Sequence, residues 1–139
     1  MRGCFFLSCC LIWTHTMVKI VIIEDDDPTR KVIAQILKRA GYEPCEAENG
    51  LKGLELIATV RPSLVLCDVE MPELTGYQTI RAVKENPATA ALPFIFLSGR
   101  NEKQDVVHGL HLKADDYLTK PFTSEELLSS VAKALGKTG

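Results

Sequence analysis

The chain has little net charge and lacks a basic stripe. Its 139 residues carry 16 Lys and Arg against 18 Asp and Glu, which gives a formal net charge of −2. Nucleic-acid-binding domains need clustered Lys and Arg to displace counterions from phosphates, so we expect no direct binding to DNA. With 46% hydrophobic and 24% charged residues, the composition is that of a globular domain that builds its own core.

Long hydrophobic runs are also missing. The most apolar stretch, Cys4 to Trp13, is about half of the ~20 residues that a membrane-spanning helix needs, so we expect no membrane span. Residues 13–16 offer no small-residue pattern for the cleavage of a secretory signal. We interpret residues 1–16 as an atypical apolar leader that is disordered or precedes the native start at Met17, and residues 17–139 as the domain. A short membrane-surface anchor is the alternative for the leader.

Cysteines at metal-binding or redox spacing are absent from the domain. Cys45 and Cys67 lie in apolar strand patterns with no CxxC spacing and no His partner nearby. We interpret them as buried thiols that behave as small hydrophobic side chains. This use of cysteine indicates a reducing, cytoplasmic compartment.

What the chain does contain, from Met17 onward, is a strict alternation of short apolar runs with helical periodicity. The predicted strands are 18–23, 42–47, 64–67, 94–97 and 114–118. In the first helix, Asp27 is the predicted N-cap, Pro28 the first helical residue, and 32–37 the apolar stripe that begins with Val32. Asn49-Gly50 is predicted as a turn, and Thr123 or Ser124 as the cap of the last helix.

Alternating strands and helices predict a parallel sheet that is covered by helices on both faces. Such sheets bind ligands beyond the carboxyl ends of their strands. Asp25, Asp68, Ser98 and Lys120 all follow or end a predicted strand. We therefore expect these side chains to meet at one edge of the sheet.

Gathered acids constrain the chemistry of that edge. Two carboxylates ~4 Å apart repel each other by about 1 kcal/mol in water and about 4 kcal/mol at an effective dielectric constant of 20. Mg²⁺ would offset this repulsion, because it prefers oxygen ligands and binds through one or two carboxylates together with phosphate oxygens. Lys120 and Ser98 would then suit a phosphoryl group, and Asp68 would be its acceptor, forming an aspartyl phosphate.

Four motifs in order resemble the receiver domain of two-component response regulators. They are VIIEDD at 21–26, LCDVEMP at 66–72 followed by Gly76, LSG at 97–99 and DDYLTKPF at 115–122. The resemblance covers Met17 to about Gly136, nearly everything but the leader. It implies a flavodoxin-like doubly wound (βα)5 fold whose five parallel strands have the order 2-1-3-4-5.

The resemblance also implies a role for each site residue. Asp68 would be the phosphoacceptor. Glu24, Asp25, Asp68 and the backbone carbonyl of Glu70 would bind Mg²⁺ or Mn²⁺.

Three further residues take roles from the same resemblance. Lys120 would contact the phosphoryl group, Ser98 would be the hydroxyl of the switch, and Tyr117 the aromatic ring that follows it. The Lys120-Pro121 peptide bond would be cis. Glu70 and Arg100 stand two positions beyond Asp68 and Ser98, and we predict that they tune the lifetime of the phosphoryl group.

A stand-alone phosphorylation switch is the predicted function, since the sequence stops where the receiver pattern stops. The phosphoryl group would come from a histidine kinase or a histidine phosphotransfer protein. The signal would pass to a protein target through the helix that begins near Asn101, the strand 114–118 and the last helix.

Two rivals stand beside this prediction. A phosphatase with a nucleophilic Asp68 would use Glu70 as its general acid but also needs a substrate-covering cap. A degenerate receiver would only bind partners, but the acid pair, Asp68 and Lys120 are all present. We therefore expect no enzyme activity beyond autophosphorylation and autodephosphorylation.

Overall fold

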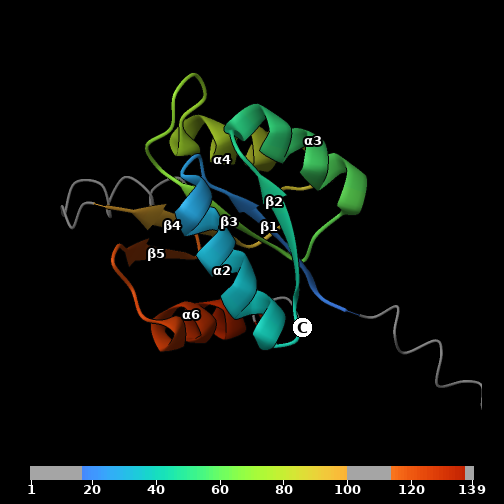
Figure 1. Cartoon of the computed structure of the whole chain (residues 1–139). Coiled ribbons are helices and arrows are strands. Elements are labelled where there is room, and N and C mark those ends of the chain that lie inside the picture. Colours follow the sequence, from blue (N-terminus) through green and yellow to red (C-terminus); the bar gives the residue numbers. More distant parts are fainter. Residues whose placement is uncertain (1–16, 100–113, 137–139) are drawn as a thin grey trace, which may run out of the picture.

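A five-stranded parallel sheet forms the centre of the molecule (Figure 1). The computed structural model describes residues 17–99 and 114–136. Its strands are β1 (Lys19–Ile23), β2 (Glu43–Ala47), β3 (Leu64–Asp68), β4 (Phe94–Ser98) and β5 (Asp116–Thr119). They are hydrogen-bonded in the order β2-β1-β3-β4-β5, with every neighbouring pair parallel. The predicted flavodoxin-like fold and its strand order are confirmed.

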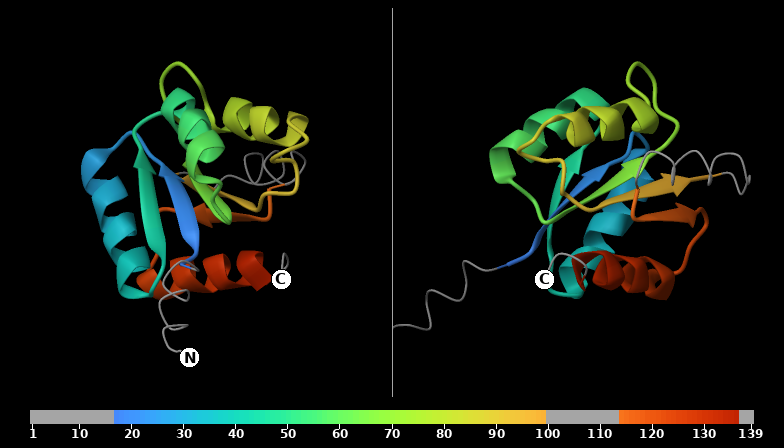
Figure 2. Two further views of the ribbon diagram at one scale, coloured as in Figure 1. Left: turned by 90° about the vertical axis from the view of Figure 1, so that its right-hand side faces the viewer. Right: turned by 180° about the vertical axis from the view of Figure 1, so that it is seen from behind.

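Helices cover both faces of the sheet (Figure 2). The helices of the described residues are α2 (Asp27–Arg39), α3 (Gly50–Val60), α4 (Gly76–Glu85) and α6 (Ser124–Gly136). Helices α2 and α6 lie on one face, and α3 and α4 lie on the other. No helix in these two described stretches is long and apolar enough to cross a bilayer. The helix predicted from about Asn101 and the leader 1–16 lie outside the described residues.

The sheet separates two hydrophobic clusters. Successive residues of a strand point to opposite faces, so Val21 and Ile23 of β1 pack with α3 and α4, whereas Ile20 and Ile22 pack with α2 and α6. Strands buried on both faces read as continuous apolar runs, and β3 and β4 are buried along their whole length. Cys67 is buried as predicted, and Cys45 is half-buried on the edge strand β2.

The start of α2 differs from the prediction by one residue. Asp26, not Asp27, is the N-cap: its carboxylate accepts the backbone N–H of Thr29 at 3.1 Å. Asp27 is instead the first helical residue, and its carboxylate pairs with Arg30. Consecutive aspartates all suit a cap, so the sequence alone did not choose between them. Val32, predicted in the apolar stripe, is 56% exposed because the stripe of α2 passes through Ile33 and Leu37 instead.

Other helix ends are capped by local side chains. Asn49 is the N-cap of α3 rather than part of a free turn, and its side chain accepts the N–H of Lys52. Thr75 and Gln78 form a reciprocal capping box at α4. Thr123 makes the same reciprocal arrangement with Glu126 at the start of α6, so of the two predicted caps, Thr123 and Ser124, Thr123 is the one observed. These caps satisfy N–H groups that a helix leaves without partners in its first turn.

Candidate functional site

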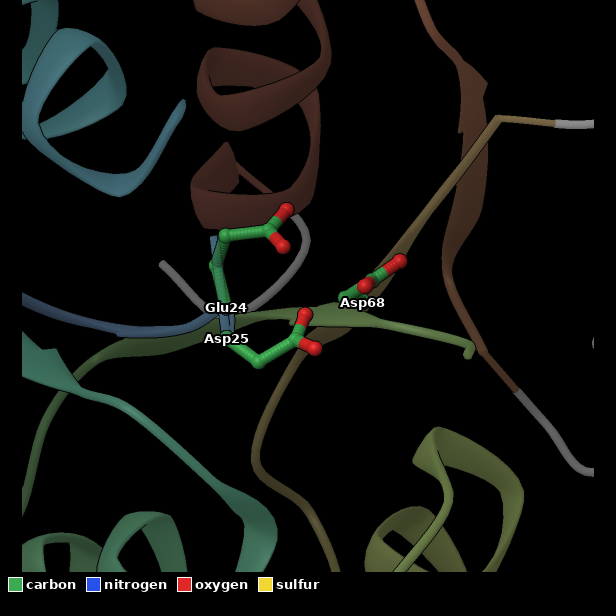
Figure 3. A group of neighbouring side chains, drawn as sticks. All are labelled: Glu24, Asp25 and Asp68. Atoms are coloured by element: carbon green, nitrogen blue, oxygen red, sulfur yellow. The ribbon is translucent and has the colours of Figure 1, made fainter. Parts of the chain in front are cut away.

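Acidic side chains gather at the carboxyl edge of the sheet. Asp68 is the last residue of β3, and Glu24 and Asp25 directly follow β1. Strands β1 and β3 are hydrogen-bonded neighbours. Asp68 therefore lies beside Glu24 and Asp25, although it is far from them in the sequence. Figure 3 shows the three carboxylates directed into one shared region.

The three carboxylates form a compact oxygen cluster. One carboxylate oxygen from each of Glu24, Asp25 and Asp68 lies within 4.8 Å of the others. Glu24 is 1% exposed and Asp68 6% exposed, whereas Asp25 reaches solvent. The repulsion among these carboxylates is stronger than it would be on the protein surface. Glu24 and Asp68 are buried, and little water remains there to screen their charges.

Lys120 faces the buried part of this cluster. Its Nζ lies 2.5 Å from Glu24 Oε1 and 3.5 Å from Asp68 Oδ1. The lysine comes from the segment after β5, and its backbone N–H donates to the carbonyl of Ser98 at 2.5 Å. The Lys120-Pro121 peptide bond is cis, as predicted. Lys120 therefore supplies a positive charge that partly compensates both buried acids.

The surroundings shift the pKa of the predicted phosphoacceptor. Burial, followed by repulsion from Glu24, raises the pKa of Asp68 from 3.8 to about 7, although Lys120 opposes that rise. Burial disfavours the charged form of a carboxyl group, and a neighbouring carboxylate does the same. The positive charge of Lys120 is therefore not enough to offset the effects of burial and of Glu24 on the ionised form of Asp68.

A divalent cation fits this arrangement. All three donor atoms are carboxylate oxygens, which are the ligands that Mg²⁺ and Mn²⁺ prefer. The exposed side of the cluster, at Asp25, leaves room for the waters that Mg²⁺ keeps. A +2 charge would also relieve the repulsion that raises the pKa of Asp68.

Of the other predicted site residues, Ser98, Tyr117 and Glu70 belong to the described residues, and they differ in burial. Ser98 is the last residue of β4, is 1% exposed, and stands opposite Thr119 in the register of β4 and β5. Tyr117 is half-buried on β5, with its ring centroid 6.2 Å from that of Phe96. Glu70 is exposed in the connection between β3 and α4. Arg100 lies outside the described residues.

Two further residues support the site: Gly76, which the sequence offered only as part of a motif, and Arg30, which was not predicted from the sequence. Gly76 N–H donates to the Val69 carbonyl, and a Cβ at Gly76 would lie 2.4 Å from the carbonyl oxygen of Asp68. Only glycine allows α4 to start this close to Asp68. The other is Arg30, which is 8% exposed and donates to the backbone carbonyl of Glu24 at 2.8 Å. Its position in the first turn of α2, after a run of acids, was the available signal.

Comparisons with known proteins agree on this architecture. The family described as "Response regulator receiver domain" matches residues 20–132. The phosphate regulon transcriptional regulatory protein PhoB of Pseudomonas aeruginosa is 38% identical over 86% of this chain. The match covers 52% of PhoB, and the chain spans about half the length of the first curated relatives it matches.

Shorter relatives are covered over most of their length. Protein PilG of Pseudomonas aeruginosa is 36% identical over 82% of this chain and 84% of PilG. Among solved structures, a putative response regulator from Chloroflexus aurantiacus superposes with a TM-score of 0.84 at 31% identity. That superposition covers 87% of this chain and 99% of the other.

Proposed function

We propose, because this chain belongs to the response regulator receiver domain family, that Asp68 accepts a phosphoryl group and so switches the domain between two signalling states. Receiver domains act as signalling switches in two-component systems and are not conventional enzymes. They bind Mg²⁺ at an acidic pocket. The cluster of Glu24, Asp25 and Asp68 supports the proposal that this chain binds Mg²⁺ in the same way.

The proposed reaction is a phosphoryl transfer from the imidazole of a phosphohistidine. An oxygen of the Asp68 carboxylate attacks phosphorus, forming an O–P bond while the N–P bond breaks and the electron pair leaves with the imidazole nitrogen. A bound Mg²⁺ would neutralise charge on the phosphoryl oxygens. Lys120 would pair with one phosphoryl oxygen, and Ser98 would donate its hydroxyl to another. The protein mainly aligns groups and balances charge.

The meeting of four charged side chains is the main support for this function. Glu24, Asp25, Asp68 and Lys120 come from three separate segments, yet their charged atoms meet at the ligand-binding edge of a parallel sheet. A folded core does not need three acids there, because their repulsion opposes folding. A site for a cation and a phosphoryl group accounts for all four residues.

The proposed partners follow from the same chemistry. Receiver domains interact with histidine kinases and downstream targets, so we propose a histidine kinase or a histidine phosphotransfer protein as the donor. The face that includes β5 and α6 would present the switched state to a target protein, with Ser98 and Tyr117 moving together. Signalling without a DNA-binding domain, the cytoplasmic location and the lifetime roles of Glu70 and Arg100 stay predictions.

The phosphatase alternative receives less support. The connection between β3 and α4 comprises residues 69–75, which is too short to hold a substrate-covering cap beside Asp68. A receiver that only binds partners would not need the intact charge cluster. The phosphorylation switch is therefore the function that the site supports best.

Incubation with acetyl phosphate and Mg²⁺, followed by intact-protein mass spectrometry, tests the proposal. The wild type should gain one phosphoryl group that alkali removes, and Asp68→Asn should gain none. Asp26→Asn is the matched control, because Asp26 is an exposed acid next to the cluster but not part of it, and its carboxylate caps α2. It should react like the wild type. A folded wild type that gains no phosphoryl group with Mg²⁺ present, or an adduct that persists in Asp68→Asn, would contradict the assignment.

A further inference from the structure

Arg30 is a buried arginine that joins three segments beside the acid cluster. It lies in the first turns of α2, and its side chain is 9% exposed. Its Nε donates to Glu46 of β2 at 3.2 Å and its Nη2 to Asp27 of α2 at 2.5 Å. Its Nη1 donates to the backbone carbonyl of Glu24 at 2.8 Å. The guanidinium is planar, so its three donors point in fixed directions. Through them Arg30 links three parts of the chain: the segment that follows β1, strand β2 and helix α2.

The bond to the Glu24 carbonyl acts on the neighbouring ligand. That carbonyl belongs to the peptide group between Glu24 and Asp25, and a peptide group is planar and rigid. Fixing its oxygen fixes the direction in which the chain enters Asp25. On the other side of Glu24, its backbone N–H donates to the Ala47 carbonyl at 3.1 Å. The backbone of the acid pair is therefore held from both sides, and Arg30 provides one of the two anchors.

We infer that Arg30 is a positioning residue for the metal ligands, acting through the backbone of Glu24 and Asp25. The inference rests on the cation site of the proposed function. Groups that orient metal ligands raise metal affinity although they do not touch the metal. Arg30 is arranged like such an orienting group. Two of its donors bind the carboxylates of Asp27 and Glu46, and the third binds the backbone carbonyl of Glu24.

Charge and position predict opposite effects for Arg30, which makes the inference testable. As a positive charge near the cluster, Arg30 repels a cation, so removing the charge alone would strengthen metal binding. As an anchor of the Glu24 carbonyl, it preorganises the ligands, so removing it would weaken metal binding. The direction of the change in affinity therefore separates the two roles.

The experiment measures Mn²⁺ affinity directly, by electron paramagnetic resonance of the free ion, with no phosphoryl donor present. Arg30→Met keeps the length of the side chain and removes the donors and the charge. Arg30→Lys keeps the charge and loses the three-donor fork. Lys31→Met is the matched control, since Lys31 pairs with the same Glu46 carboxylate at 3.0 Å but is exposed and lies on the solvent side of α2. Circular dichroism first establishes that each variant is folded at the temperature used.

Arg30→Met and Arg30→Lys should each bind Mn²⁺ about tenfold more weakly than the wild type, and Lys31→Met should stay within about twofold. Unchanged or tighter binding by folded Arg30→Met would overturn the inference, as would a wild type that binds no Mn²⁺. If Arg30→Met does not fold, Arg30→Lys alone decides, with the same criterion.

Phosphorylation of the same proteins by acetyl phosphate distinguishes a failure of the proposed function from a failure of the role of Arg30. A wild type that binds Mn²⁺ but takes no phosphoryl group from acetyl phosphate contradicts the proposed function and leaves the affinity comparison valid. A wild type that is phosphorylated while both folded Arg30 variants bind Mn²⁺ normally contradicts only the role of Arg30.

Discussion

Lys120 binds the buried Glu24 more closely than it binds Asp68. Its Nζ lies 2.5 Å from Glu24 Oε1 and 3.5 Å from Asp68 Oδ1. Glu24 is 1% exposed, and a buried carboxylate is strongly destabilised without a partner. One ammonium group is thus shared between two buried acids, so a change at Lys120 should affect both.

Removing the Lys120 charge should raise the pKa of Asp68. Lys120 lowers that pKa by its positive charge, against burial and Glu24, which raise it. In Lys120→Met, the carboxyl of Asp68 should therefore titrate at a higher pH than in the wild type. Carbon-detected NMR of side-chain carboxyl groups in metal-free protein measures this shift. Lys52→Met, which removes an exposed lysine that pairs with Glu48, should leave the titration of Asp68 unchanged. An unshifted Asp68 in Lys120→Met would contradict the shared-charge arrangement.

Metal-free stability should fall as the pH rises through the range set by Asp68. The pKa of Asp68 is raised from 3.8 to about 7 on folding, so between these values the folded state binds more protons than the unfolded state. The free energy of unfolding then decreases with pH, by up to about 1.4 kcal/mol per pH unit from this group. The contribution is favourable below pH 3.8, relative to high pH, and is lost by about pH 7.

Urea unfolding in EDTA across this pH range measures the effect. Asp68→Asn should show a flatter profile and, at pH 8, a higher free energy of unfolding than the wild type, because the repulsion with Glu24 is gone. Addition of Mg²⁺ should raise the stability of the wild type by more than that of the variant. Parallel pH profiles for the two proteins would show that Asp68 does not carry this dependence.

Gly76→Ala should destabilise the fold although alanine is the better helix former. The new Cβ would lie 2.4 Å from the Asp68 carbonyl oxygen and 2.9 Å from the Val69 Cα, and both are backbone atoms that cannot rotate away. We expect a loss of about 1–3 kcal/mol, measured by urea unfolding. Gly136→Ala is the control at the end of α6, where no atom of residues 17–99 or 114–136 lies within 4 Å of the new Cβ. An equal effect of the two substitutions would contradict the close approach of α4 to Asp68.

Ser130→Ala should weaken the attachment of α6 to β5. Ser130 Oγ donates to Asp116 Oδ2 at 2.5 Å, and Ser130 is 4% exposed. A hydrogen bond to a charged group contributes about 1.5–3 kcal/mol, and we expect the low end because Asp116 Oδ1 still accepts the N–H of Tyr117. Ser129→Ala, at the exposed neighbour on the same helix, should change the free energy of unfolding by less than about 0.5 kcal/mol. Thermal unfolding followed by circular dichroism compares the pair.

Much of the fold followed from local patterns. Continuous apolar runs such as Leu64 to Cys67 are typical of strands buried on both faces, and each of the five predicted strands overlaps a strand of the sheet. The last strand, predicted over 114–118, begins only at Asp116. The last residue of a strand was harder to assign, because Asp68 and Ser98 are polar yet belong to β3 and β4. Hydrogen bonding to the neighbouring strand, which only the folded sheet provides, decided those ends.

The site could be located but not detailed from the sequence. Strand ends predicted that Asp25, Asp68, Ser98 and Lys120 would meet at one edge of the sheet. Asp25 and Asp68 do lie together, with Glu24, and Lys120 contacts Glu24 and Asp68. Ser98 ends β4 at the same edge. The preference of Lys120 for Glu24 depends on side-chain reach and burial, which no local pattern contains. Arg30 was missed for a related reason: its partner Glu46 is distant in the chain, and only the alignment of β1 with β2 brings the two together.

The division of the core by the sheet has a mechanical consequence at the acid cluster. Glu24 and Asp25 lead directly into α2, which packs in one hydrophobic cluster, while the chain after Asp68 leads into α4, which packs in the other. The three carboxylates are therefore carried by chain segments that continue into helices on opposite faces of the sheet. A ligand bound to all three carboxylates would connect the segment that leads into α2 with the segment that leads into α4. Its binding or release would therefore change how firmly the two helical layers are held to each other.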